Sequence, residues 1–143
     1  MTSTKISIAL ITILGAATAH ANQCNSNNTG VEGTYTATTT GWITGASREP
    51  FTAIAVKKLK GGVVTPLYQL LVQDGVAREP LVAGGTYQVS AVAGAKGTCL
   101  VVFTFAGGYQ NTGLTTDNGN HISVIGNGGN GSTTSTEYVR VAP

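Results

Sequence analysis

The sequence predicts an all-β fold: after a cleaved signal peptide, a single small β-sandwich, immunoglobulin-like or similar, with about seven to nine short strands. Three observations support this. β-Branched residues and an alternation of apolar and polar residues recur along the chain. Gly- and Asn-rich turns separate the short apolar runs. No window places apolar residues at i, i+3, i+4 and i+7 between capping signals, which argues against helices.

The first 21 residues have the layout of a secretory signal peptide. Lys5 precedes an apolar run over residues 6–17, which is too short to span a bilayer, and the segment ends in Ala-His-Ala. Cleavage after Ala21 leaves 122 residues, although a cut after Ala19 also satisfies the small-residue rule. We therefore expect a secreted, extracellular protein, or a periplasmic one if the source is a Gram-negative bacterium. Membrane insertion is not expected, because "STEYVRVAP" at the C-terminus carries no apolar tail.

The two cysteines of the chain predict a disulfide bond. Cys24 and Cys99 form an even pair in an exported chain and lack the C-x-x-C spacing of redox or zinc sites. Closing a loop of this length stabilises the fold by about 4 to 5 kcal/mol in the chain-entropy model. The bond would fix residues 22–33, expected to be an extended polar arm, to the β-domain expected over residues 34–143.

The first half of the domain is expected to contain three strands and a hairpin. A strand is predicted over residues 34–45, with a bend at Gly41. "FTAIAVKKLK" (51–60) is apolar on both faces until Lys57, so we expect it to begin in the core and end in water, its lysines guarding against edge pairing. Asp74-Gly75 predicts a tight hairpin between strands at 67–73 and 76–82.

The second half begins with two strands at residues 84–94 and 98–108. In the second of these, Cys99, Val101, Phe103 and Phe105 are expected to share one face. "LVAGGTYQVSAVAG" (81–94) places a Gly turn before a Tyr-centred strand. In this it resembles many extracellular immunoglobulin-like and transthyretin-like modules, and the resemblance implies a sandwich without selecting one family.

Residues 107–134 are rich in Gly, Asn, Thr and Ser, and only "HISVI" (121–125) is expected to pair as a strand before a final strand at 136–142. Long loops in compact domains are usually functional. We therefore expect the loops at 107–120 and 126–134 to form the binding surface. Its candidate residues are Tyr109, Asn111, Asp117, Asn118, His121, Asn127 and Asn130.

Composition excludes several classes of function. Without the signal peptide, seven basic and six acidic residues remain, so we expect no nucleic-acid partner. His121 is the one histidine left after cleavage, so a two-histidine metal site is not expected. A Ser-His-Asp triad is not expected either, because the sequence shows no partner residue that would adjust the pKa of its imidazole. Glu49 and Glu79, each in the tripeptide Arg-Glu-Pro, could pair only if the fold brought them together. We expect no cofactor and no catalytic residues, so the protein is not expected to be an enzyme.

A copper site is the one metal alternative. Cleavage after Ala19 would make His20 the N-terminus, whose amine and imidazole could bind Cu(II) with His121 and, axially, Tyr138. Such a histidine brace would favour copper oxidase or oxygenase-like chemistry.

The leading functional hypothesis is a small secreted, disulfide-bonded binding protein. Its profile resembles that of many secreted effectors of plant-associated fungi, which implies an extracellular protein or glycan partner and a monomer. Asn27 and Asn130 match the acceptor pattern for N-linked glycans. The alternative is a self-associating surface or adhesin subunit that pairs strand edges.

Overall fold

The computed structural model describes Cys24 and residues 28–43, 49–79, 84–128 and 132–143; the signal-peptide prediction lies outside these residues. The described residues form nine strands and two short 3₁₀ turns, and no helix among them is long and apolar enough to cross a membrane. In chain order the elements are η2 (Thr29–Val31), β1 (Gly33–Ile43), β2 (Glu49–Lys60), β3 (Val63–Gln73), β4 (Val76–Arg78), β5 (Gly85–Ala91), β6 (Cys99–Phe105), β7 (Gln110–Thr116), η3 (Asp117–Gly119), β8 (His121–Gly128) and β9 (Ser132–Ala142).

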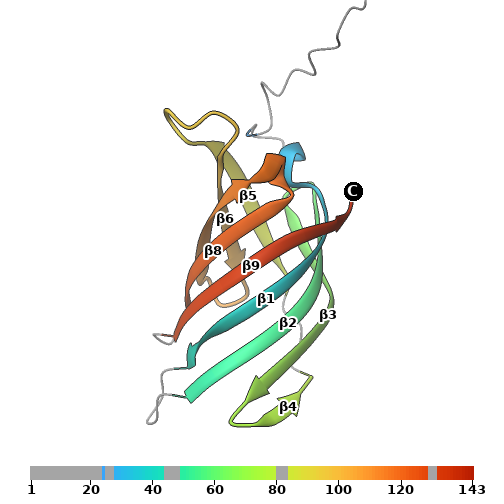
Figure 1. The fold of residues 1–143 in the computed structure, drawn as a ribbon, viewed down its shortest axis with the longest axis vertical. Coiled ribbons are helices and arrows are strands. Elements are labelled where there is room, and N and C mark those ends of the chain that lie inside the picture. Colours follow the sequence, from blue (N-terminus) through green and yellow to red (C-terminus); the bar gives the residue numbers. More distant parts are fainter. Residues whose placement is uncertain (1–23, 25–27, 44–48, 80–83, 129–131) are drawn as a thin grey trace, which may run out of the picture.

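The strands close into an antiparallel barrel, so the prediction of a β-sandwich is wrong (Figure 1). Each strand of the barrel pairs with the next one in the chain, and β1 pairs with β9 from Thr34–Ala142 to Trp42–Thr133. β4 alone lies outside the ring of eight, as a short hairpin partner at the end of β3. Alternating sequences fit both architectures, because each buries one face of every strand; the β1–β9 pairing decides between them.

Local turn chemistry explains where several strands end. Asp74 and Gly75 both have positive φ, and Gln73 pairs with Val76, which confirms the predicted hairpin. β4 is only three residues long, however, and β5 joins β3 through two residue pairs at Val63 and Val64.

The stretch expected to be a long loop is mostly strand. β7 occupies residues 110–116 and pairs with both β6 and β8. β8 continues to Gly128, and β9 already begins at Ser132. The prediction failed because the inward-facing position in the middle of β7 is Gly113, where a bulky apolar side chain would have indicated a strand. A Cβ there would meet Ser123 O and Val124 Cγ2, each at 2.7 Å.

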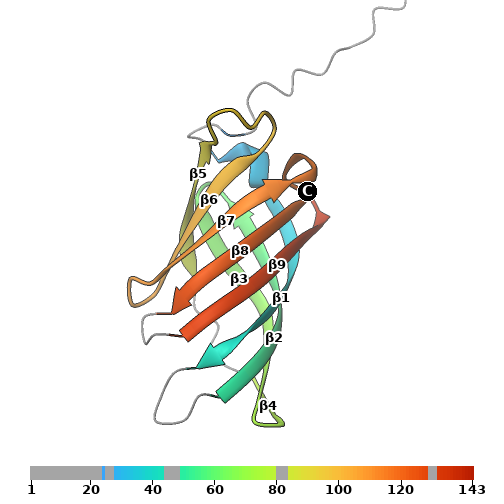
Figure 2. The ribbon, with the colours of Figure 1, turned by 60° about the vertical axis from the view of Figure 1, so that its left-hand side comes forward.

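The predicted disulfide is confirmed: Cys24 is bonded to Cys99 at the start of β6, with Cα atoms 5.2 Å apart. Cys99 is buried, and its N–H donates to Thr115 Oγ1 at 2.8 Å. The bond ties Cys24, which precedes η2 in the chain, to the same end of the barrel as η3, the upper end in Figures 1 and 2.

That end, which we call the plugged end, is closed by Arg140 and Tyr35. Arg140 Nε and Nη2 lie 3.0 and 2.8 Å from the hydroxyl of Tyr35, and Nη2 also donates to Gly30 O at 3.0 Å. The guanidinium stacks on the Tyr35 ring, with its carbon 5.3 Å from the ring centroid. The Tyr35 hydroxyl shares its own proton between Val31 O and Gly119 O, which joins η2 to η3.

An aromatic column runs from this plug through the interior. Tyr35 meets Tyr138 edge-on at 6.3 Å, and Tyr138 stacks on Phe103 at 5.3 Å. Phe103 stacks on Phe105, which stacks on Tyr109 at 5.5 Å. The predicted inward face of β6 is therefore confirmed, since Cys99, Val101, Phe103 and Phe105 are all buried.

Replacing Arg140 with Met should destabilise the fold. The change removes charge-assisted hydrogen bonds to partly buried oxygens, so we expect the free energy of unfolding to fall by about 2 kcal/mol. Urea denaturation measures this. Arg78→Met is the control, because Arg78 is exposed on β4; it should change the value by less than about 0.5 kcal/mol. Equal effects of the two variants would show that Arg140 does not hold the plug.

Candidate functional site

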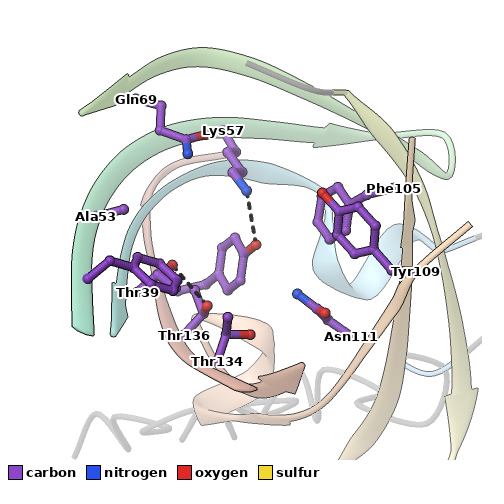
Figure 3. Close-up of a pocket in the computed structure, with 11 residues that line it drawn as sticks. Thr39, Ala53, Lys57, Gln69, Phe105, Tyr109, Asn111, Thr134 and Thr136 are labelled. Atoms are coloured by element: carbon purple, nitrogen blue, oxygen red, sulfur yellow. Dashed lines mark hydrogen bonds between the residues drawn. The ribbon is translucent and has the colours of Figure 1, made fainter. Parts of the chain in front are cut away.

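A cavity of about 200 Å³ lies inside the barrel at the end opposite the plug, which we call the mouth. Figure 3 shows its lining, which comes from strands on all sides of the barrel and from the β6–β7 turn. The eleven lining residues are Thr39, Phe51, Ala53, Lys57, Gln69, Phe105, Tyr109, Asn111, Thr134, Thr136 and Tyr138.

The cavity exists because the inward side chains near the mouth are small. Ala53, Thr39 and Thr136 occupy inward positions there, whereas Leu59, Val64 and Tyr87 fill the interior near the plug. Thr39 Oγ1 and Thr136 Oγ1 bond each other at 2.9 Å across β1 and β9. Their hydroxyls are thus satisfied by each other, and the wall stays small and polar on this side.

Lys57 lies inside the barrel, contrary to the expectation that this part of the strand ends in water. The inward alternation Ala53, Ala55, Lys57, Leu59 continues through it. Its Nζ lies 3.5 Å from the Tyr138 hydroxyl and 5.0 Å from the centroid of the Phe105 ring (Figure 3). The lining contains no carboxylate, and Lys57 forms no salt bridge with any described residue. Burial accordingly lowers the pKa of Lys57.

Tyr138 supplies the second polar group at the centre of the cavity. Only 2% of Tyr138 is exposed, and burial, together with the nearby Tyr109, raises its pKa, so the phenol stays neutral. Its oxygen accepts from Lys57, and its own proton has no acceptor among the described residues. The ammonium and the phenol therefore both offer protons toward the cavity.

Two further polar side chains of the lining lie on β7 and β9. Asn111 Oδ1 and Thr134 Oγ1 are buried and have no hydrogen-bond partner among the described residues. Both atoms lie over Gly126, where a Cβ would collide with each of them. Buried polar atoms without partners are rare in native folds.

The residues predicted to bind are divided between the two ends of the barrel. Tyr109 and Asn111 line the cavity, whereas Asp117, Asn118 and His121 lie at the plugged end, in or beside η3. The backbone of Asn127 belongs to β8, and Asn130 lies outside the described residues, as does Asn27, which was expected only as a glycosylation acceptor. The predicted set is therefore not one surface.

The structure does not bring the copper candidates together. His121 Nε2 pairs with Glu137 Oε2 at 2.7 Å on the outer surface, whereas the next residue of β9, Tyr138, points inward. His20 lies outside the described residues. Within the described part of the chain, no group of three His, Cys, Asp or Glu could hold a metal ion.

Two other predicted features lie on the surface. Glu49 Oε2 accepts from Gln73 Nε2 at 2.6 Å, and Glu79 is exposed after β4. A wider, open groove of about 620 Å³ runs beside the chain end, between Asp117 and Arg140. We favour the mouth cavity over this groove, because the groove is a surface depression and Arg140 is already engaged in the plug.

Sequence reasoning missed Lys57 because three lysines in four residues resemble a solvated strand end. The signal that could have identified it is Leu59: the apolar residues at positions 53, 55 and 59 share one face of the strand, and alternation places Lys57 on that same face. The small residues Thr39, Thr134 and Thr136 carry no comparable signal, since Thr is common on both faces of these strands.

Lys57→Met should stabilise the protein at neutral pH. Because the pKa of Lys57 is lowered, the folded protein holds this proton less tightly than the unfolded chain does. The free energy of unfolding of the wild-type protein therefore rises with pH only between the lowered pKa and the ordinary value of about 10.4. At pH 7 the Met variant avoids the cost of the enclosed ammonium, which we expect to raise the melting temperature by about 4 °C, or about 1 kcal/mol.

Lys58→Met is the matched control, because Lys58 is the next residue on the outer face. Its melting temperature should stay within about 1 °C of the wild-type value. The gain from Lys57→Met should shrink in scans above neutral pH. A loss of stability in the Lys57 variant would show that its contacts with Phe105 and Tyr138 outweigh the cost of burial.

Comparison with family models, with curated proteins and with solved structures gives no match to this chain. The geometry of the barrel and of its cavity therefore carries the functional conclusion alone.

Proposed function

We propose that this is an exported binding protein that holds a small molecule inside its barrel. The observation that supports this proposal is the mouth cavity of about 200 Å³, which is lined by four aromatic rings and by the polar side chains of Lys57, Gln69, Asn111 and three threonines. An eight-stranded barrel is just wide enough to be filled by side chains or to hold one small ligand. Pockets for small molecules combine apolar walls with a few placed polar groups.

The size of the cavity points to a ligand built on one ring. An apolar cavity of about 150 Å³ in another protein binds benzene. The mouth cavity is somewhat larger, and Phe51, Phe105 and Tyr109 offer ring faces to a flat ligand.

Export is part of the proposal. The signal-peptide layout of residues 1–21 supports it, as does the disulfide between Cys24 and Cys99, since such bonds persist in oxidising compartments. A contact surface on residues 107–120 and 126–134 has less support than the cavity, because β7 occupies half of the first segment and β8 and β9 extend into the second.

Titration of the ¹⁵N-labelled protein with phenylacetamide, a neutral single-ring probe, tests the function by NMR. We expect saturable amide shifts grouped on the cavity wall, around residues 105–111 and 134–138. Shifts confined to the outer face, or no shifts with either phenylacetamide or phenylacetate at millimolar concentration, would contradict a binding cavity.

Ala53→Leu should abolish these shifts, because Ala53 lines the cavity with only 6% of its surface exposed. The larger side chain fills part of the space that the ring needs. Ile54→Phe is the control. Ile54 follows Ala53 in β2 but is 49% exposed on the outer face, so binding should persist in this variant. A dispersed spectrum for each variant shows that it is folded.

A further inference from the structure

Lys57 places an uncompensated positive charge inside the barrel. The cavity lining contributes no carboxylate, and Lys57 has no salt bridge with any described residue. The groups that face its ammonium are the hydroxyl of Tyr138, the ring of Phe105, and the neutral side chains of Tyr109 and Gln69. An enclosed charge is costly unless a counter-charge meets it. An anionic ligand would supply that counter-charge.

The Lys57 ammonium and the Tyr138 hydroxyl are both hydrogen-bond donors, which favours an anion as their partner. Lys57 donates to the Tyr138 oxygen, so the phenol proton is directed away from the ammonium. An oxygen placed beside both groups would accept from the ammonium and from the phenol together. Hydrogen bonds with an ionised partner are about twice as strong as neutral ones. A carboxylate fits this pair because one of its oxygens can accept both bonds.

The remainder of the cavity fits the body of such a ligand. Phe105 and Tyr109 stack on each other at a centroid distance of 5.5 Å, at the mouth end of the aromatic column. A ring extending from the carboxylate toward the mouth would pack against this stacked pair.

We propose, on the basis of the proposed function, that the cavity selects small aromatic carboxylates, with the carboxylate held by Lys57 and Tyr138 and the ring against Phe105 and Tyr109. The ligand class is therefore a single-ring organic acid rather than a neutral apolar compound.

Phenylacetate and phenylacetamide form a matched pair of probes, because they share size and shape and differ in charge. Calorimetry or NMR titration at pH 7 should show phenylacetate binding at least tenfold more tightly. Lys57→Met should reduce the affinity for phenylacetate to that for the amide and leave the amide within about twofold. Tyr138→Phe, which keeps the ring, should weaken phenylacetate by roughly fivefold. Lys58→Met should leave both affinities unchanged.

The outcomes of these titrations test the selectivity for anions apart from the binding function itself. Equal affinity for acid and amide would overturn the selectivity for anions and leave the binding function standing. Binding of neither probe would overturn both. A preference for the acid that survives Lys57→Met would show that another cation holds the carboxylate and would overturn the assignment to Lys57.

The pH dependence gives a second readout. Since the anion needs a protonated Lys57, affinity for phenylacetate should fall once pH exceeds the lowered pKa of this lysine, before the ordinary lysine value of about 10.4 is reached. Tyr138 stays neutral over this range because its pKa is raised. The affinity for phenylacetamide should not change over the same range. A constant affinity for the acid up to pH 10 would contradict the role of Lys57.

Discussion

The pairing of β1 with β9 is the constraint on which the rest of the structure depends. It converts a chain of hairpins into a closed barrel with an inside and two ends. It also brings Arg140, in the last strand, onto Tyr35, in the first. Their contacts join η2 and η3 over one end of the barrel, and the disulfide from Cys24 fixes the same end.

With one end filled, the interior can be hollow only at the other. The aromatic column carries close packing from Tyr35 toward the mouth, and beyond Tyr138 the wall changes to Thr and Ala. Lys57 and the unpartnered oxygens of Asn111 and Thr134 are each unfavourable for folding alone. Two of the three buried side-chain oxygens without a partner among the described residues line the same cavity as Lys57, while the third, the Tyr87 hydroxyl, lies nearer the plug. A ligand that meets the Lys57 ammonium would offset a cost that folding leaves unsatisfied.

The sequence was informative where the cause was local. The Asp74-Gly75 hairpin, the Cys24–Cys99 bond and the buried face of β6 follow from turn chemistry, cysteine parity and alternation. Barrel closure was not predictable in this way, because it joins residues about a hundred positions apart and alternation is equally consistent with a sandwich. β7 was missed because Gly113 replaces the apolar signal. In the site, Tyr109 and Asn111 were expected as surface loop residues and instead line the cavity, while Lys57 was hidden among neighbouring lysines.

A crystal structure of the protein with 4-bromobenzoate tests the central claim most directly, because anomalous scattering locates the bromine without ambiguity. The account predicts one bromine site inside the barrel near Phe105 and Tyr109, with the carboxylate within hydrogen-bond distance of Lys57 Nζ and the Tyr138 hydroxyl. A bromine in the outer groove beside Asp117 and Arg140, or a barrel interior without ligand at saturating concentration, would contradict it.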